Sequence, residues 1–137
     1  MAHVRTETTI DATPEEVWDA LRDWGALHDR LAPGFVIGTR VEGDERVVTF
    51  FNGAVARELI VDVDDDARRI AYAVVESPLN LRHHHASAQV LAEGADRCRF
   101  VWTADLLPEE SAQRVRELMD RGTAAVQNAF ERQATSA

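Results

Sequence analysis

The segment after Pro108 sets the strongest limit on how this chain can fold, because its apolar residues recur at helical spacing up to about Arg132. The members of this stripe are Val115, Leu118, Met119, Gly122, Ala125, Val126, Ala129 and Phe130. A helix of about 24 residues is about 36 Å long. In a chain of 137 residues, a helix of that length can lie only across a sheet.

The residues before this helix predict the sheet. Six ranges rich in β-branched and aromatic residues are separated by turn signals, and they are 36–41, 46–51, 54–63, 69–75, 81–92 and 97–106. The pair Asn52-Gly53 is the strongest hairpin signal between them. Alternation over residues 3–10 predicts one further strand at the N-terminus.

A helix start stands between the first strand and the other six. Thr13 is placed as the N-cap, Pro14 as the first helical residue, and Glu16 three positions after the cap, as in a capping box. The pair Trp24-Gly25 ends this helix, and a second short helical segment is expected over residues 26–31.

This order of elements predicts an α+β fold. We expect a strongly curved antiparallel sheet of about seven strands wrapped around the C-terminal helix, with the elements in the order strand, two short helices, six strands and long helix. The length of 137 residues and the 45% apolar content favour a single domain over residues 1–137. A curved sheet that grips one helix seldom closes tightly at both ends, so a cavity between them is expected.

Charge and cysteine content narrow the classes of function. Fifteen basic and 24 acidic residues give a net charge of -9, which argues against binding to nucleic acid or to an anionic membrane surface. The single cysteine, Cys98, excludes an internal disulfide and paired-cysteine metal sites. No segment has the apolar core of a signal peptide or the roughly 20 apolar residues of a membrane span. A cytoplasmic protein without metal or cofactor is therefore expected.

Three consecutive histidines, His83 to His85, raise the question of a metal site. Side chains alternate between the two faces of a strand, so the three cannot converge on one ion. The apolar series over residues 86–90 places His84 inside and the other two outside. His83 and His85 would lie about 6.6 Å apart, and they would bind zinc only with a third ligand from a neighbouring strand. We therefore predict no metal site and expect these two to face solvent.

Hairpin pairing also places a carboxylate inside. If Asn52-Gly53 forms a two-residue loop, Val47 pairs with Glu58, and Glu58 faces the interior. An unpaired carboxylate in an apolar interior costs several kcal/mol, so Glu58 then needs a tyrosine, a histidine or an arginine as its partner. If the register is shifted by one residue, Glu58 is exposed and Arg57 points inward.

Three segments resemble the START-like, helix-grip superfamily, which is also called SRPBCC. DATPEEVWDALRDWGALHDRLAPGF is similar to its opening motif, in which a Pro-initiated helix carries the pair Val17-Trp18. RVVTFFNGAVARELIVDVDDDARRIAYAVVESP resembles its glycine turn, its strand with an inward glutamate, its Asp-rich turn and its Arg-x-Ile-x-Tyr strand. CRFVWTADL resembles its last strand with Trp102. The branch of polyketide cyclase/dehydrase-like proteins is the most similar one.

The resemblance implies a cavity for a hydrophobic or aromatic small molecule between the sheet and the C-terminal helix. We expect its ligand-binding walls to come from Ile60, Val74, Phe100, Trp102, Met119 and Val126. The protein is expected to be a monomer or a homodimer.

Three functions remain open at this point. In a polyketide cyclase or dehydratase, His84 would move protons as a general base, Glu58 would orient it, and Tyr72 would stabilise an enolate oxygen. A non-catalytic intracellular carrier or sensor of a lipid-like ligand would need only the apolar walls. An interaction module similar to the chaperone activators would need a large exposed apolar stripe, which the sequence does not predict.

Overall fold

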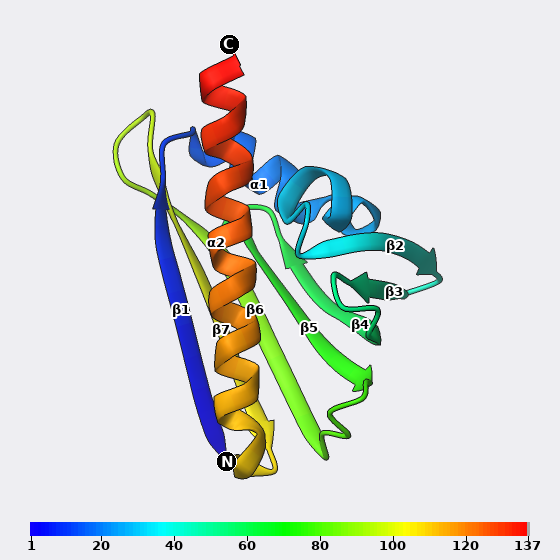
Figure 1. Ribbon diagram of the computed structural model, residues 1–137. Helices are drawn as coiled ribbons and strands as arrows, with labels where there is room; N and C mark the ends of the chain where they lie inside the picture. Colours follow the sequence, from blue (N-terminus) through cyan, green and yellow to red (C-terminus); the bar gives the residue numbers. More distant parts are fainter. Residues whose placement is uncertain (137) are drawn as a thin grey trace.

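The structure is a computed structural model that describes residues 1–136, with side chains through residue 131. Within this range, seven strands form one antiparallel sheet in the order β1-β7-β6-β5-β4-β3-β2. The strands are β1 (Ala2–Ile10), β2 (Val36–Glu42), β3 (Glu45–Phe50), β4 (Val55–Asp64), β5 (Arg69–Glu76), β6 (His83–Ala92) and β7 (Cys98–Leu107). The helix α2 (Ala112–Ser136) crosses one face of this curved sheet (Figure 1). The α+β helix-grip fold predicted from the sequence is confirmed.

The N-terminal strand β1 pairs with β7, the last strand along the chain. β1 pairs with β7 along its whole length, from Ala2 opposite Leu106 to Ile10 opposite Cys98. The pairing of β4 with β5 shifts at two places, one of them between Ile60 and Asp62. Such bulges bend a strand and increase its local twist, which helps this sheet to curve around α2.

The helix α1 (Pro14–Arg22) begins where the sequence predicts it. Thr13 Oγ1 accepts a hydrogen bond from the Glu16 backbone N–H at 3.1 Å. At the buried side of the helix, Trp18 Nε1 donates to Asp65 Oδ1 in the β4–β5 turn at 3.0 Å. Two short helical turns follow, η1 (Trp24–Ala26) and η2 (Leu27–Leu31), and together they cover one end of the sheet.

The turn between β3 and β4 is longer than the two-residue loop that Asn52-Gly53 predicted. β3 ends at Phe50 and β4 begins at Val55, so four residues form the connection. The Asn52 side chain accepts a hydrogen bond from the Ala54 backbone N–H at 3.1 Å, and Gly53 has a φ of 85°. This side-chain bond builds a wider turn than a two-residue hairpin allows.

The wider turn shifts the predicted pairing by one residue on β3. Glu58 lies opposite Arg46 and not opposite Val47. Glu58 nevertheless faces inward and is 5% exposed. The alternative in which Arg57 points inward is wrong, because Arg57 pairs with Glu42 and Glu45 on the outer side.

The helix α2 follows a short turn, η3 (Glu109–Ser111), and its backbone lies close to aromatic side chains at Gly122. A Cβ atom at Gly122 would lie 2.8 Å from Trp102 Cζ3 and 2.9 Å from Phe35 Cε2. One residue further, the Thr123 and Thr6 hydroxyls form a buried hydrogen bond of 2.7 Å between α2 and β1. The glycine therefore allows the helix backbone to rest against aromatic rings.

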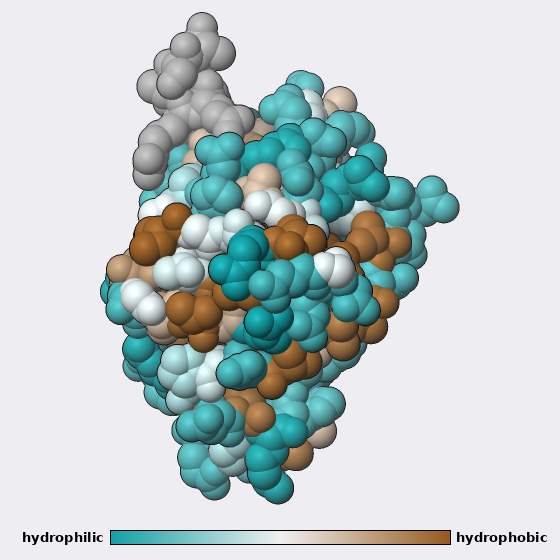
Figure 2. Space-filling model, turned by 90° about the vertical axis from the view of Figure 1, so that its right-hand side faces the viewer, coloured by the Kyte–Doolittle hydropathy of each residue, from teal (hydrophilic) through white to brown (hydrophobic). Residues whose placement is uncertain are grey.

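The side of the molecule that carries β2 to β5 exposes several large apolar side chains. Ile37, Val55, Val61 and Val75 are each about half exposed, and Figure 2 shows hydrophobic residues between hydrophilic ones on this side. Within the described part of the chain, α2 and the shorter helices all lack the combination of length and apolarity that a membrane span requires.

Candidate functional site

A cavity of about 240 Å³ lies between α2 and the sheet. Five of the six predicted ligand-binding residues line it, namely Val74, Phe100, Trp102, Met119 and Val126. The sixth, Ile60, is not among the lining residues. It is half-buried and packs against the neighbouring core cluster instead. Whether any of the five binds a ligand stays a prediction.

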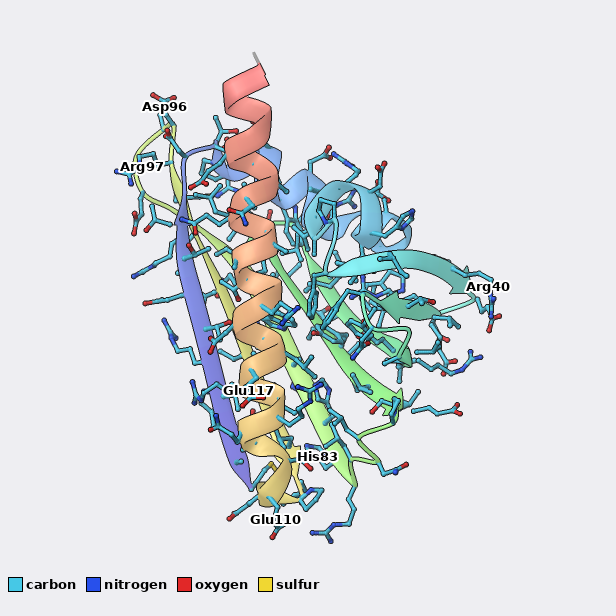
Figure 3. All side chains as sticks on the ribbon, in the orientation of Figure 1. Arg40, His83, Asp96, Arg97, Glu110 and Glu117 are labelled. Carbon is cyan, nitrogen blue, oxygen red and sulfur yellow. The ribbon has the colours of Figure 1, made fainter. Side chains whose placement is uncertain are left out.

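The cavity reaches the surface between α2 and two connections of the sheet. Three of its lining residues are exposed: Asn52 in the β3–β4 turn, Pro78 in the β5–β6 connection and Arg114 on α2. Figure 3 shows side chains of α2 and of the strands between the helix and the sheet. A small molecule could therefore enter from this side without unfolding the sheet.

A buried ion pair forms one part of the cavity wall. Arg46 Nε and Nη2 both lie 2.8 Å from Glu58 Oε1, and the two residues are 6% and 5% exposed. Arg46 Nη1 also donates to the Trp24 backbone carbonyl at 3.2 Å, and its guanidinium carbon lies 3.5 Å from the centre of the Trp24 ring. Glu58 is thus paired with an arginine, one of the three partners expected.

Arg46 is a site residue that the sequence reasoning missed. On β3 it alternates with the buried Val48 and the cavity-lining Phe50, so it belongs to the inward series of that strand. This alternation along β3 could have identified Arg46 as an inward residue, but the assumed two-residue turn placed Val47 on the inner face instead.

Tyr72 lines the cavity beside this ion pair, and together with His84 these residues form what we call the polar wall. The Tyr72 ring is buried and lies 5.9 Å from the His84 ring, measured between centroids. Trp102 Nε1 donates a hydrogen bond to the Tyr72 hydroxyl oxygen at 2.9 Å. Burial, and next the charge of Glu58, raise the pKa of Tyr72 well above its usual range. The hydroxyl therefore keeps its proton, and among the described residues no acceptor is hydrogen-bonded to that proton.

His84 lies where β5 and β6 separate. The last backbone pair of these two strands joins Tyr72 and Ala86. Beyond it, the Val74 backbone N–H donates to His84 Nδ1 at 2.9 Å, so the imidazole ring replaces a strand partner. A nitrogen that accepts a hydrogen bond carries no proton, so in the neutral ring the proton is on Nε2.

This arrangement makes His84 a hydrogen-bond donor. Burial, and next the nearby His83 and His85, lower the pKa of His84 to about 4, so the ring is neutral near pH 7. Its one free nitrogen, Nε2, bears a hydrogen and has no lone pair to offer. The observed geometry therefore fits a general base poorly and fits a donor to a ligand oxygen well.

The other two histidines of the run lie away from the cavity. His83, labelled in Figure 3, is exposed at the start of β6, and His85 is partly buried in register with Asp105 of β7. Neither lines the cavity. Across the described side chains, no three His, Cys, Asp or Glu residues come together in a way that could hold a metal ion.

The polar wall can therefore polarise a carbonyl group more readily than it can remove a proton. Tyr72 and His84 both line the apolar cavity with their ring centroids 5.9 Å apart, and each carries one neutral donor. Among the described lining residues Glu58 is the one carboxylate, but protonating it would leave the buried Arg46 charge without its partner. The predicted catalytic trio is thus brought together, while its roles remain a matter for proposal.

Comparison with known proteins adds family information. The sequence matches, over residues 1–136, the family described as "Polyketide cyclase / dehydrase and lipid transport". A search of curated proteins finds no match.

Several solved structures share the fold. XoxI from Bacillus cereus superimposes with a TM-score of 0.85 at 22% identity, covering 95% of this chain and 96% of that one. Norcoclaurine synthase from Thalictrum flavum, in complex with dopamine and hydroxybenzaldehyde, gives 0.74 at 20% identity, covering 98% and 87%. The ZhuI aromatase/cyclase from Streptomyces sp. R1128 gives 0.73 at 21% identity, covering 98% and 93%. At these identities the likeness shows the fold alone.

Proposed function

Since the chain belongs to the polyketide cyclase / dehydrase and lipid transport family, we propose that it binds a hydrophobic or aromatic small molecule in the cavity between α2 and the sheet. The observation that carries this proposal is the composition of the cavity wall. Apolar side chains make up most of it, and four polar side chains lie together away from the mouth: Arg46, Glu58, Tyr72 and His84. This division into an apolar body and a small polar region is typical of small-molecule sites.

Native mass spectrometry of protein purified from its own host tests the binding proposal. We expect a co-purifying small molecule in the wild type. A cavity-filling variant, Ala56→Leu, should lose it, because Ala56 is buried and lines the cavity. The matched control is Val55→Leu on the same strand, since Val55 is 48% exposed and does not line the cavity. Equal ligand content in both variants would contradict binding at this site.

A second candidate is catalysis of a cyclisation or dehydration. The observation that favours it is the pair of fixed donors, Tyr72 and His84, which could stabilise charge on a carbonyl oxygen as it develops. Holding a flexible chain in a folded conformation inside the cavity would lower the entropic part of the barrier. Removal of a donor should then reduce turnover more than affinity.

One variant distinguishes the carrier from the enzyme. His84→Gln should leave ligand affinity within a few-fold if the protein is only a carrier. A large loss of turnover at unchanged affinity, measured with a poly-β-keto substrate, would favour the enzyme and reject the carrier. The aromatase/cyclase among the structural neighbours makes this substrate class the first one to assay.

A further inference from the structure

We infer that the cavity selects a small neutral aryl ketone or aldehyde of one or two rings, whose carbonyl oxygen accepts hydrogen bonds from Tyr72 and His84. This inference rests on the proposed function and deepens it, because it names the chemical class of the ligand. It follows from three properties of the described lining residues: their charge, the volume they enclose and the hydrogen-bond donors they leave unused.

The charges on the cavity wall favour a neutral ligand. Arg46 and Glu58 neutralise each other at 2.8 Å, and both are buried. The other cation among the described lining residues is Arg114, which is exposed at the mouth and lies 3.5 Å from Glu117. A carboxylate taken into the cavity would lose its hydration without gaining an unpaired cation, which is unfavourable.

The volume favours a small ligand. The cavity of about 240 Å³ exceeds the roughly 150 Å³ of an engineered apolar cavity that binds benzene. It is smaller than the ~300–1,000 Å³ of sites for drug-sized ligands. One or two fused rings with a short substituent therefore fit, whereas a ligand of three or more rings or a long acyl chain would need the walls to move apart.

The unused donors favour a carbonyl oxygen. Trp102 holds the Tyr72 hydroxyl oxygen at 2.9 Å, and the Val74 backbone N–H holds His84 Nδ1 at 2.9 Å. Each ring is thus fixed by a bond to its acceptor atom, while its own hydrogen has no acceptor among the described residues. A carbonyl oxygen has two lone pairs and can accept from both donors. A hydrocarbon of equal shape would leave both donors unpaired on a dry wall.

The test compares two isosteric probes and an anionic chain by ligand-observed NMR. 2-Acetylnaphthalene carries the carbonyl, 2-isopropenylnaphthalene replaces its oxygen with a CH₂ group, and decanoate supplies an anionic chain. We expect the ketone to bind about tenfold more tightly than the hydrocarbon, because two hydrogen bonds distinguish them. We expect decanoate to bind more weakly than the ketone.

Two variants test whether the preference for the ketone over the hydrocarbon depends on the cavity-lining residue Tyr72. Tyr72→Phe keeps the ring and removes one donor, so it should weaken ketone binding about threefold or more. It should not weaken hydrocarbon binding, because one donor fewer is left unpaired. Phe100→Leu, the matched control at an apolar lining position, should weaken both probes alike. Thermal unfolding of each variant verifies that it is folded.

Three results overturn the inference. Equal affinities for the ketone and the hydrocarbon exclude carbonyl recognition, while they leave the proposed binding function intact. Tighter binding of decanoate than of the ketone excludes selection for a neutral ligand. If no probe binds, this ligand class is wrong, and the native mass spectra of wild type and Ala56→Leu then decide separately on the proposed function.

Discussion

Removal of the Glu58 charge should destabilise this protein far more than removal of any surface carboxylate. Glu58→Gln keeps the size of the side chain but leaves the Arg46 guanidinium, 6% exposed, without its anion. Arg46 would retain the Trp24 carbonyl at 3.2 Å and its stacking on the Trp24 ring, which are weaker compensation than a carboxylate at 2.8 Å. Breaking a buried ion pair on one side typically costs about 3–5 kcal/mol, a large part of the ~5–15 kcal/mol that stabilises a domain.

Urea unfolding followed by circular dichroism measures this loss. The matched control is Glu7→Gln, because Glu7 pairs with Arg5 at 3.0 Å on the surface, where both side chains are about half exposed. That change should alter the free energy of unfolding by less than about 1 kcal/mol. The double variant Arg46→Met/Glu58→Leu removes both charges and should recover most of the stability, since apolar replacement of a buried pair is often neutral or favourable.

The pattern across these variants decides whether the reasoning holds. A strong coupling between positions 46 and 58 is the expected result when Arg46→Met and Glu58→Leu are measured singly and together. The reasoning would be refuted if Glu58→Gln remained within about 1 kcal/mol of the wild type, or if the double variant were no more stable than Glu58→Gln.

Three further outcomes are expected. Gly122→Ala should lower the free energy of unfolding in urea by about 1–3 kcal/mol, because its Cβ would lie 2.8 Å from Trp102 Cζ3. This loss is expected even though alanine is the better helix former by about 1 kcal/mol. The control Ala124→Gly, at an exposed position of α2, should verify that helix preference. A gain in stability on Gly122→Ala would exclude the close approach. In an unfolding series between pH 4 and 7, the wild type should be most stable above pH 6.5 and lose stability as the pH falls toward the His84 pKa of about 4, because the unfolded chain binds the proton first. The slope should reach up to ~1.4 kcal/mol per pH unit and should be smaller in His84→Gln, whereas equal slopes would contradict a buried neutral His84. Burial raises the pKa of the Cys98 thiol to about 11, so Ellman's reagent at pH 8 should label Cys98 only after unfolding, and rapid labelling of the native protein would contradict its burial.

Local signals account for the elements that the sequence predicted well. α1 begins at Pro14 because Thr13 caps it and proline suits its first turn, and both effects act within four residues. The apolar alternation of β6 against β7 placed His84 inward, and Ala88 does lie opposite Trp102. Such features depend on neighbours in sequence or on a period of two, so they are visible before folding.

The β3–β4 hairpin shows where local signals became insufficient. The pair Asn52-Gly53 correctly indicated a turn, but the Asn52 side chain bonded the Ala54 backbone and lengthened the connection. One residue of difference exchanges the inward and outward members of a strand. It brought Arg46 opposite Glu58 in place of Val47, and that exchange placed the ion pair in the cavity wall.

The sequence by itself determined the order of the elements, the length of α2 and the inward orientation of His84, because periodicity and capping are properties of neighbouring residues. It left two orientations open for Glu58, and the register of β3 with β4 decided between them. Only the tertiary structure decided the partner of Glu58, the tautomer of His84 and the volume left beneath α2. Each of these depends on groups that meet across strands or across the sheet–helix interface: Arg46 with Glu58, the Val74 N–H with His84, and Gly122 with Trp102. Such contacts form when the chain folds, so side-chain spacing along a single segment does not reveal them.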